Sequence, residues 1–409
     1  MPHILLYKQS LSDLLSCLKP REEEVGSCLI QYLDVFVSNN EILIPTNIIT
    51  ETGCVRFVIK VLQKGENTMI KIGTGAKVEA NYLIKEAVKR VGLFIQKNTN
   101  SHTVWSNLSI NKKMDYFFDY SKRFEIDIDA FRNVHSLFKN ENPLNVEIGF
   151  GNGEFLLYQA QNERSKNFIG FELESKSFSL VKRKLWDLGL NNVKIMRCNG
   201  TFAMDVLFED ESVENIFLCF PSPWFKEKKI KHAVVNKDFV DLISHKLMKG
   251  GSFELVTDNY PYLSYSVELL DQSGFFRKGE VDINPEREVV TYFERRWKRK
   301  GRTIYGIKYF KIKRQNKKRE PLYKKIDFPI ATNIPHKCSI KRGKAILRIL
   351  NVYSSLYSSD IFVETVVGDI KYPQHIYFHL KKGKTHFFLY PFTSLIPTEG
   401  VEDSLKRLI

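Results

Sequence analysis

Long apolar runs are missing from the sequence, since no stretch approaches the roughly 20 residues that span a bilayer. The N-terminus, Met-Pro-His-Ile-Leu-Leu-Tyr-Lys, lacks the charged region and the small-residue cleavage site of a signal peptide. The six cysteines are scattered without a C-x-x-C pair, which argues against a disulfide framework or a zinc site. We therefore expect a globular cytoplasmic protein that needs neither a membrane nor a metal.

Negative charge is scarcer than positive charge, because 62 Lys and Arg face 47 Asp and Glu and leave a net charge of +15. Nearly all of this excess lies in the tract from Arg295 to Lys325, where fifteen Lys and Arg accompany a single acid, Glu320. Aromatic residues are interleaved with the cations, an arrangement that suits base stacking beside phosphate contacts. The tract predicts a nucleic acid partner, although a solvated face or a linker would leave the same pattern.

Three domains are predicted from the change of pattern along the chain. Residues 1–120 form a small α+β accessory domain, residues 121–325 alternate strands with helices, and residues 326–409 form a β-rich accessory domain. The alternation predicts a mostly parallel, doubly wound α/β sheet with helices on both faces and one antiparallel late strand. Its predicted strands are Leu144–Ile148, Asn167–Phe171, Val193–Arg197, Val213–Phe220, Gly251–Thr257 and Thr303–Ile312, with helices at Glu154–Gln161, Lys176–Leu188, Asp238–Met248 and Tyr262–Gln272.

A glycine turn follows the first strand of this domain, with glycines at Gly149, Gly151 and Gly153. Glycines let a ligand approach the main chain closely at a helix N-terminus. The spacing is G-x-G-x-G, whereas a dinucleotide site uses G-x-G-x-x-G to receive a pyrophosphate. The carboxylate of Glu147 stands two residues before the first glycine, so the segment predicts a cationic, phosphate-free nucleoside cofactor.

Polar residues follow the later strands, at the sheet edge where ligands of such folds bind. Glu172 follows the second strand and suits ribose hydroxyls, with Glu174 as a competitor for that role. Asn199 follows the third strand and either meets an adenine edge or makes an ordinary Asn-Gly turn. Further along come Ser222 and Lys226 in a Pro-Ser-Pro-Trp-Phe-Lys loop, then Asp258, then Thr291, Tyr292, Phe293 and Glu294.

In their order, these motifs resemble the bacterial tRNA (guanine-N7-)-methyltransferases. The resemblance covers about residues 140–312 and implies a class I methyltransferase, Rossmann-like fold that uses S-adenosylmethionine to methylate guanine 46 of tRNA. It implies cofactor binding by Glu147, Gly149, Gly151, Gly153, Glu172, Asn199 and Ser222. It also implies substrate contacts from Lys226, Asp258, Thr291, Tyr292, Phe293 and Glu294.

Two positions depart from the family pattern. Ser222 stands where the family has a catalytic or cofactor-contacting Asp, and Asn199 stands where it has an Asp facing the adenine. We expect a working enzyme, since guanine N7 has no proton to remove. The alternatives are an exocyclic-amine methyltransferase of the same fold and a tRNA-binding homologue with impaired catalysis.

Overall fold

The computed structural model describes residues 3–7, 9–50, 53–73, 82–108, 137–221, 233–319, 338–381, 387–390, 395–396 and 398–406. The chain divides into two compact units. The central unit comprises residues 120–322, and the flanking unit comprises residues 1–119 together with residues 323–409. The two segments predicted as accessory domains are grouped in one unit, while the predicted domain boundaries themselves stay a prediction.

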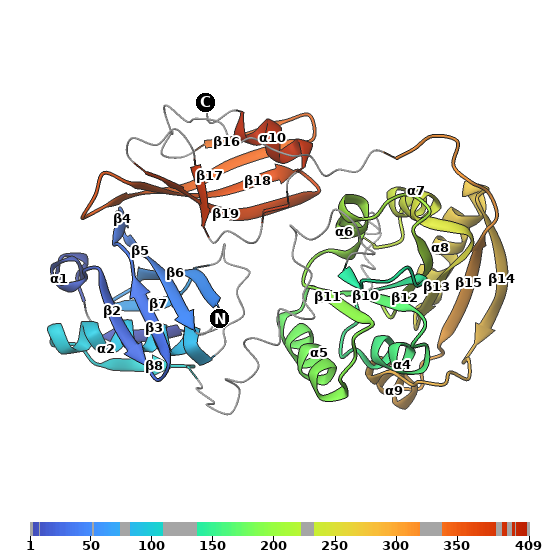
Figure 1. Ribbon diagram of the computed structural model, residues 1–409, viewed down its shortest axis with the longest axis horizontal. Helices are drawn as coiled ribbons and strands as arrows, with labels where there is room; N and C mark the ends of the chain where they lie inside the picture. Colours follow the sequence, from blue (N-terminus) through green and yellow to red (C-terminus); the bar gives the residue numbers. More distant parts are fainter. Residues whose placement is uncertain are drawn as a thin grey trace. The chain divides into compact units, whose positions relative to one another are not determined.

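The central unit is built on a seven-stranded sheet of order β11-β10-β9-β12-β13-β15-β14 (Figure 1). The strands from β9 to β13 pair in parallel, and β15 runs antiparallel to both β13 and β14, as expected for the late strand. The strands are β9 Leu144–Ile148, β10 Asn167–Phe171, β11 Val193–Met196, β12 Val213–Cys219, β13 Leu247–Thr257, β14 Phe276–Ile283 and β15 Tyr305–Lys311.

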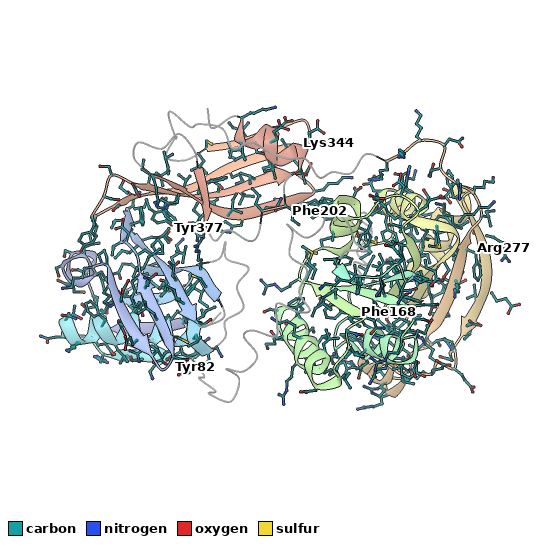
Figure 2. All side chains as sticks on the ribbon, in the orientation of Figure 1. Tyr82, Phe168, Phe202, Arg277, Lys344 and Tyr377 are labelled. Atoms are coloured by element: carbon teal, nitrogen blue, oxygen red, sulfur yellow. The ribbon has the colours of Figure 1, made fainter. Side chains whose placement is uncertain are left out.

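Helices cover both faces of this sheet, with α4 and α5 on one face and α6, α7 and α8 on the other (Figure 1). Phe168 of β10 and Phe202 of α6 are both buried, and side chains fill the space between the layers (Figure 2). The strands β9 and β10 are buried along their whole length, as parallel strands covered on both faces should be. The helices are α4 Glu154–Asn162, α5 Ser175–Leu188, α6 Gly200–Leu207, α7 Lys237–Lys246, α8 Tyr260–Ser273 and α9 Tyr292–Arg299.

The flanking unit has a 13-stranded sheet in which β4 of the N-terminal segment pairs with β17 of the C-terminal segment. Its helices are α1 Leu11–Cys17, α2 Tyr82–Asn98 and α10 Glu399–Leu405. Its strands are β1 His3–Tyr7, β2 Arg21–Val25, β3 Cys28–Tyr32, β4 Phe36–Ser38, β5 Glu41–Thr50, β6 Gly53–Lys64, β7 Asn67–Ile72, β8 Thr103–Ser106, β16 Cys338–Arg342, β17 Ala345–Ser355, β18 Ile361–Asp369, β19 Tyr372–Leu380 and β20 Phe387–Tyr390.

A buried polar cluster also joins the two segments of the flanking unit. The Lys60 Nζ lies 2.8 Å from Glu41 Oε2 and 3.1 Å from Glu364 Oε2, and Tyr353 donates to both carboxylates. Burial alone would raise the pKa of Glu364, but a hydrogen bond from His375 and the charge of Lys60 lower it to about 2. The cluster therefore holds an ionised carboxylate between strands that are far apart in the sequence.

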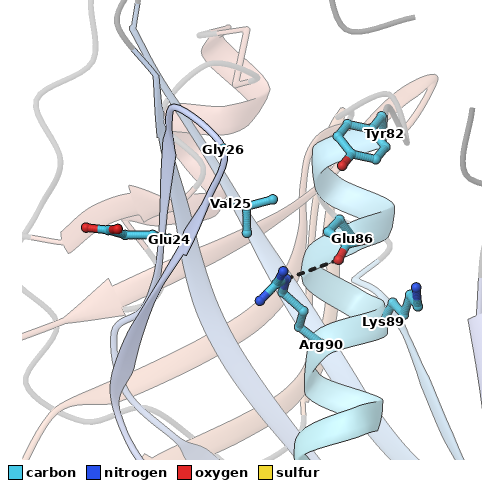
Figure 3. A pocket seen from close by; sticks show the side chains of 7 residues that line it. All are labelled: Glu24, Val25, Gly26, Tyr82, Glu86, Lys89 and Arg90. Carbon is cyan, nitrogen blue, oxygen red and sulfur yellow. Dashed lines mark hydrogen bonds and ion pairs between the residues drawn. The ribbon is translucent and has the colours of Figure 1, made fainter. Parts of the chain in front are cut away.

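A hollow of about 680 Å³ lies beside α2 in the flanking unit (Figure 3). Of the two cations that line it, Lys89 and Arg90, Arg90 is paired, because Arg90 Nε lies 3.1 Å from Glu86 Oε1 and Arg90 Nη1 lies 3.0 Å from Glu23 Oε2. The hollow belongs to a different unit from the glycine turn and shares no residue with it. Within the described residues, no helix combines the length and the apolar character that a membrane crossing requires.

Candidate active site

The glycine turn links β9 to α4 by backbone that only glycine adopts readily. Gly149, Gly151 and Gly153 have φ angles of 73°, 51° and 73°. The Gly149 N–H donates to the Phe171 carbonyl of β10 at 2.7 Å, and the Gly153 N–H donates to the Phe150 carbonyl at 2.7 Å. The turn is therefore folded tightly against the carboxyl end of β10, and α4 begins directly after Gly153.

Glu147 is a buried acid on β9, with 3% of its surface exposed. Burial raises the pKa of Glu147 to about 8, although Arg287 nearby opposes the rise and Glu172 adds to it. No hydrogen-bond partner of Glu147 Oε2 is found among the described residues. A buried acceptor without a partner is costly, so this oxygen favours a ligand that brings a positive charge or a donor.

Glu172 closes the turn from the neighbouring strand. Its Oε2 accepts from the Gly151 N–H at 2.8 Å, and its Oε1 accepts from the N–H groups of Leu173 and Glu174 at 2.7 and 2.9 Å. The competitor Glu174 is used elsewhere, because its Oε2 accepts from the Ser177 N–H in the first turn of α5 at 2.6 Å. Of the two acids, Glu172 is the one that the structure brings to the glycine turn.

Asn199 lies at the end of the third strand as an N-cap. Its Oδ1 accepts from the Phe202 N–H at 3.1 Å and so begins α6, a helix that the sequence pattern had not predicted. The next residue, Gly200, fits tightly, because a Cβ there would lie 3.0 Å from Ile148 and from Phe171. The cap explains an Asn in this place, and its contact with an adenine stays a prediction.

The segment Thr291–Glu294 lies beside the glycine turn. Thr291 caps α9, and its hydroxyl accepts from the Glu294 N–H at 3.3 Å. The Tyr292 N–H donates to the carboxylate of Glu154, the first residue of α4. A Cβ placed on Gly151 would be 3.5 Å from the ring of Phe293. Two segments about 140 residues apart in the sequence thus meet at one turn.

Asp258 follows β13 and is paired with Arg302, whose guanidinium also lies 4.2 Å above the ring of Trp297. Its side chain is only 8% exposed. The structure therefore fixes Asp258 at the same edge of the sheet as Glu147 and Glu172, although by a different strand. The other two predicted residues, Ser222 and Lys226, lie outside the described residues.

Sequence reasoning missed two residues that hold this site together. Glu154 follows the last glycine and pairs with Arg295 as well as with the Tyr292 N–H. Arg287 is in the loop between β14 and α9, and its side chain is 9% exposed. A carboxylate next to Gly153 was visible in the sequence as a first-turn acid, whereas nothing around Arg287 resembles a motif.

Many cations of the basic tract have partners within the central unit. Thirteen of them are described, from Arg295 to Arg319, and six of these pair with carboxylates. Arg319 is the most heavily engaged of the six, with Asp205 at 2.7 Å and Asp241 at 2.5 Å. The exposed cations Arg296 and Arg299 on α9 have no carboxylate partner among the described residues. They form, with Lys300, the part of the tract best placed to meet a polyanion.

The family that matches this chain and its similar proteins are all described as methyltransferases. The sequence pattern of the family described as "Putative methyltransferase" matches residues 141–307. A tRNA (guanine-N(7)-)-methyltransferase of Streptococcus thermophilus is 33% identical over 177 residues, which are 42% of this chain and 83% of the relative. One from Thermotoga maritima is 33% identical over 183 residues, 45% of this chain but only 58% of the relative.

A relative from Aquifex aeolicus extends the match. This tRNA (guanine-N(7)-)-methyltransferase is 26% identical over 278 residues, which are 65% of this chain and 92% of the relative. Since the central unit spans residues 120–322, the match must include part of the flanking unit.

Among solved structures, a 16S rRNA methyltransferase is 12% identical with a TM-score of 0.36, covering 44% of this chain and 94% of that one. An rRNA methylase from Streptococcus thermophilus is 15% identical with a TM-score of 0.31, covering 50% of this chain and 99% of that one. TM-scores this low say nothing of function. The tRNA (guanine-N(7)-)-methyltransferase of Streptococcus thermophilus is 33% identical to this chain over 83% of its own length. On this identity, the chain belongs to the tRNA (guanine-N7-)-methyltransferase family.

Proposed function

We propose that the protein transfers a methyl group from S-adenosylmethionine to N7 of guanine 46 in tRNA by in-line displacement. Family membership supports the reaction class. The observation that carries the proposal for this chain is the meeting of Glu147, Glu172 and the Thr291–Glu294 segment at one glycine turn. The first two supply the cofactor side and the third supplies the substrate side.

The residues present fit S-adenosylmethionine, the cofactor of this methyltransferase. The unpartnered Oε2 of Glu147 suits a cationic group, and the Glu172 carboxylate at the end of β10 suits a ribose. A Cβ on Gly149 would meet no atom of the described residues within 4 Å, so the backbone there faces space that a ligand can approach. When bound, the cofactor supplies a methyl group on a positively charged sulfur that leaves as a neutral thioether.

The chemistry demands alignment more than proton transfer. Guanine N7 carries a lone pair and no proton, so its methylation would require no general base from the residues of this chain. The dominant contributions are then orientation and electrostatics. Glu147 and Glu172 hold the cofactor side, Asp258 and Glu294 orient the guanine, and the half-exposed rings of Tyr292 and Phe293 border the base.

Methyl transfer to tRNA tests the proposal directly. Purified full-length protein is incubated with tritiated cofactor and tRNA, and the product is cleaved chemically at N7-methylguanine. Cleavage at guanine 46 is the expected result. Label on an exocyclic amine would favour the first alternative function. Cofactor binding by calorimetry without any turnover would favour a tRNA-binding homologue and contradict the proposed function.

Replacing Ser222 with aspartate should raise kcat for tRNA by up to about tenfold, because a charge-assisted hydrogen bond is stronger than that of a neutral hydroxyl. The Ser222→Ala variant is the matched control and should be slower than the parent. Single-turnover methylation with both variants measures the effect. Equal rates for the three proteins would show that position 222 has no role in the chemistry.

Removing Arg296 and Arg299 together should weaken tRNA binding and flatten its salt dependence. Each lost phosphate contact lowers the slope of log K against log salt by about 1. Lys278→Ala is the control, since Lys278 is an exposed cation on β14, outside the basic tract, and is paired with Asp271. Binding titrations at several salt concentrations measure both slopes. An unchanged slope in the double variant would exclude this part of the tract from the interface.

Two further properties stay predictions. The cytoplasmic location rests on the scattered cysteines, and the domain boundaries rest on the sequence pattern alone. The flanking unit is proposed to assist tRNA binding, since the match to the Aquifex aeolicus relative reaches into it.

A further inference from the structure

Arg287 reaches several elements of the central unit from a loop. Its guanidinium lies 3.5 Å from Glu294 Oε2 on α9 and 3.8 Å from Glu254 Oε1 on β13. It donates to Cys219 Sγ at 3.5 Å, at the end of β12, and lies 5.0 Å above the ring of Phe155 on α4. One buried cation therefore connects the substrate-side helix α9 with two strands and a helix of the cofactor side.

The register of the sheet places a second carboxylate near this cation. Phe217 of β12 pairs with Glu147 on β9 and with Glu254 on β13. Residues paired in register on neighbouring strands lie on the same face of a sheet, so both acids flank Phe217 on one face. The ring centroids of Phe155 and Phe217 are 5.0 Å apart, and the guanidinium of Arg287 lies over the ring of Phe155. Arg287 therefore lies over the face of the sheet on which Glu147, Phe217 and Glu254 stand side by side.

Among the described residues, acidic side chains outnumber cations in this region. Three carboxylates, Glu147, Glu254 and Glu294, face Arg287, and the Glu172 carboxylate adds to the negative field at Glu147. Burying carboxylates without a cation is costly, and losing one partner of a buried ion pair costs more than the pair itself contributes. Burial raises the pKa of Glu147 to about 8, and the attraction of Arg287 is the largest influence that opposes this rise, ahead of a backbone hydrogen bond from Leu156.

We propose that Arg287 is a positioning residue that couples the cofactor-side carboxylate Glu147 to the substrate-side carboxylate Glu294. Its charge acts on Glu147, and its planar fork places Nη1 at Glu294 Oε2 and Nη2 at Glu254 Oε1. The inference rests on the proposed function for the roles of these two acids. The two actions can be separated, because lysine keeps the charge of Arg287 but not its fork.

Arg287→Met and Arg287→Lys should therefore differ. Glu147 must be ionised to attract a cationic cofactor, so in Arg287→Met the pH midpoint of S-adenosylmethionine affinity should move up by about one unit, weakening Kd at pH 7 about tenfold. Arg287→Lys should restore this midpoint. Both variants should lose about tenfold in kcat for tRNA, because neither keeps the fork that places one nitrogen at Glu294 and the other at Glu254. Calorimetry against pH and single-turnover methylation give the two measurements.

Lys298→Met is the matched control. It removes the other cation on Glu294, whose Nζ lies 2.8 Å from Oε1, and leaves Arg287 and its neighbours in place. Its pH midpoint of cofactor affinity should equal that of the parent. Cys219 is a further titratable neighbour, but burial raises its pKa to about 12, well above the range of the titration.

Failure of the inference differs from failure of the proposed function. If the parent protein methylates tRNA while Arg287→Met keeps both its pH midpoint and its kcat, the inference is wrong. If the parent methylates no guanine N7, the proposed function is wrong, and the calorimetric midpoints still decide the effect of Arg287 on Glu147. If Arg287→Met does not fold, a parental kcat in Arg287→Lys overturns the coupling.

Discussion

Replacing Glu147 with glutamine is expected to stabilise the folded protein while it removes tight binding of S-adenosylmethionine. Burial raises the pKa of Glu147 from an ordinary 4.5 to about 8, so at pH 7 the folded chain holds a proton that the unfolded chain has released. Between these two values folding takes up a proton, and the stability that Glu147 contributes falls as the pH rises. Glutamine does not titrate, so the free energy of unfolding of Glu147→Gln should not fall with pH for this reason.

The size of the gain follows from the width of this pH window. At pH 7 the shift corresponds to roughly 3 kcal/mol in the free energy of unfolding, at about 1.4 kcal/mol for each pH unit above the ordinary pKa. The advantage of Glu147→Gln should vanish near pH 4.5 and be greatest at pH 8 and above. Urea unfolding of both proteins at pH 4.5, 6, 7 and 8 measures it.

Cofactor affinity should change in the opposite sense. An ionised Glu147 attracts a cation, so the affinity of the parent protein should rise with pH up to about 8, while that of Glu147→Gln should be weak and flat. Glu172→Gln is the control: it should also bind weakly but gain no stability, since the Glu172 carboxylate accepts three backbone N–H groups. A stability difference that does not vary with pH would show that Glu147 is ionised in the free protein.

The parts of the fold that the sequence predicted best are those with a purely local cause. Leu144–Ile148 and Asn167–Phe171 were predicted residue for residue, because short segments rich in Leu, Ile, Val and Phe between turns predict strands. The helices α6 and α9 were missed. The first is short and begins at an Asn-Gly pair, and the second, Tyr-Phe-Glu-Arg-Arg-Trp-Lys-Arg, has too few apolar residues to show a helical period.

The same limit applies to the candidate site. The sequence could predict that Glu147 and Glu172 lie near each other, since the carboxyl ends of neighbouring parallel strands meet at one edge of the sheet. The sequence could not predict the place of Arg287, because its contacts with Glu254 and Glu294 depend on how the loop after β14 folds back over the sheet. The pairing of β4 with β17 likewise joins segments more than 300 residues apart, and no local pattern specifies it.

Alanine at Gly149 and at Gly153 should damage different properties of the protein, although both glycines have a φ of 73°. Any residue with a Cβ pays about 1–2 kcal/mol for this conformation. At Gly153 the new methyl would also lie 2.5 Å from Val181 Cγ2 on α5, so Gly153→Ala should lose roughly 3 kcal/mol or more. At Gly149 the methyl would meet no atom of the residues that the structure describes within 4 Å.

The open space at Gly149 is where we place the cofactor, so Gly149→Ala should lose only about 1–2 kcal/mol in stability but more than tenfold in cofactor affinity. Gly189→Ala supplies the comparison, since Gly189 has a φ of 61°, an equally empty surrounding and no part in the site. It should lose the same stability and keep the parental Kd. Urea unfolding and calorimetry on the three variants separate backbone strain, packing against α5 and ligand approach. Parental cofactor affinity in Gly149→Ala would place the ligand away from this turn, whereas a selective loss there, with Gly189→Ala unaffected, would locate it against the backbone that follows β9.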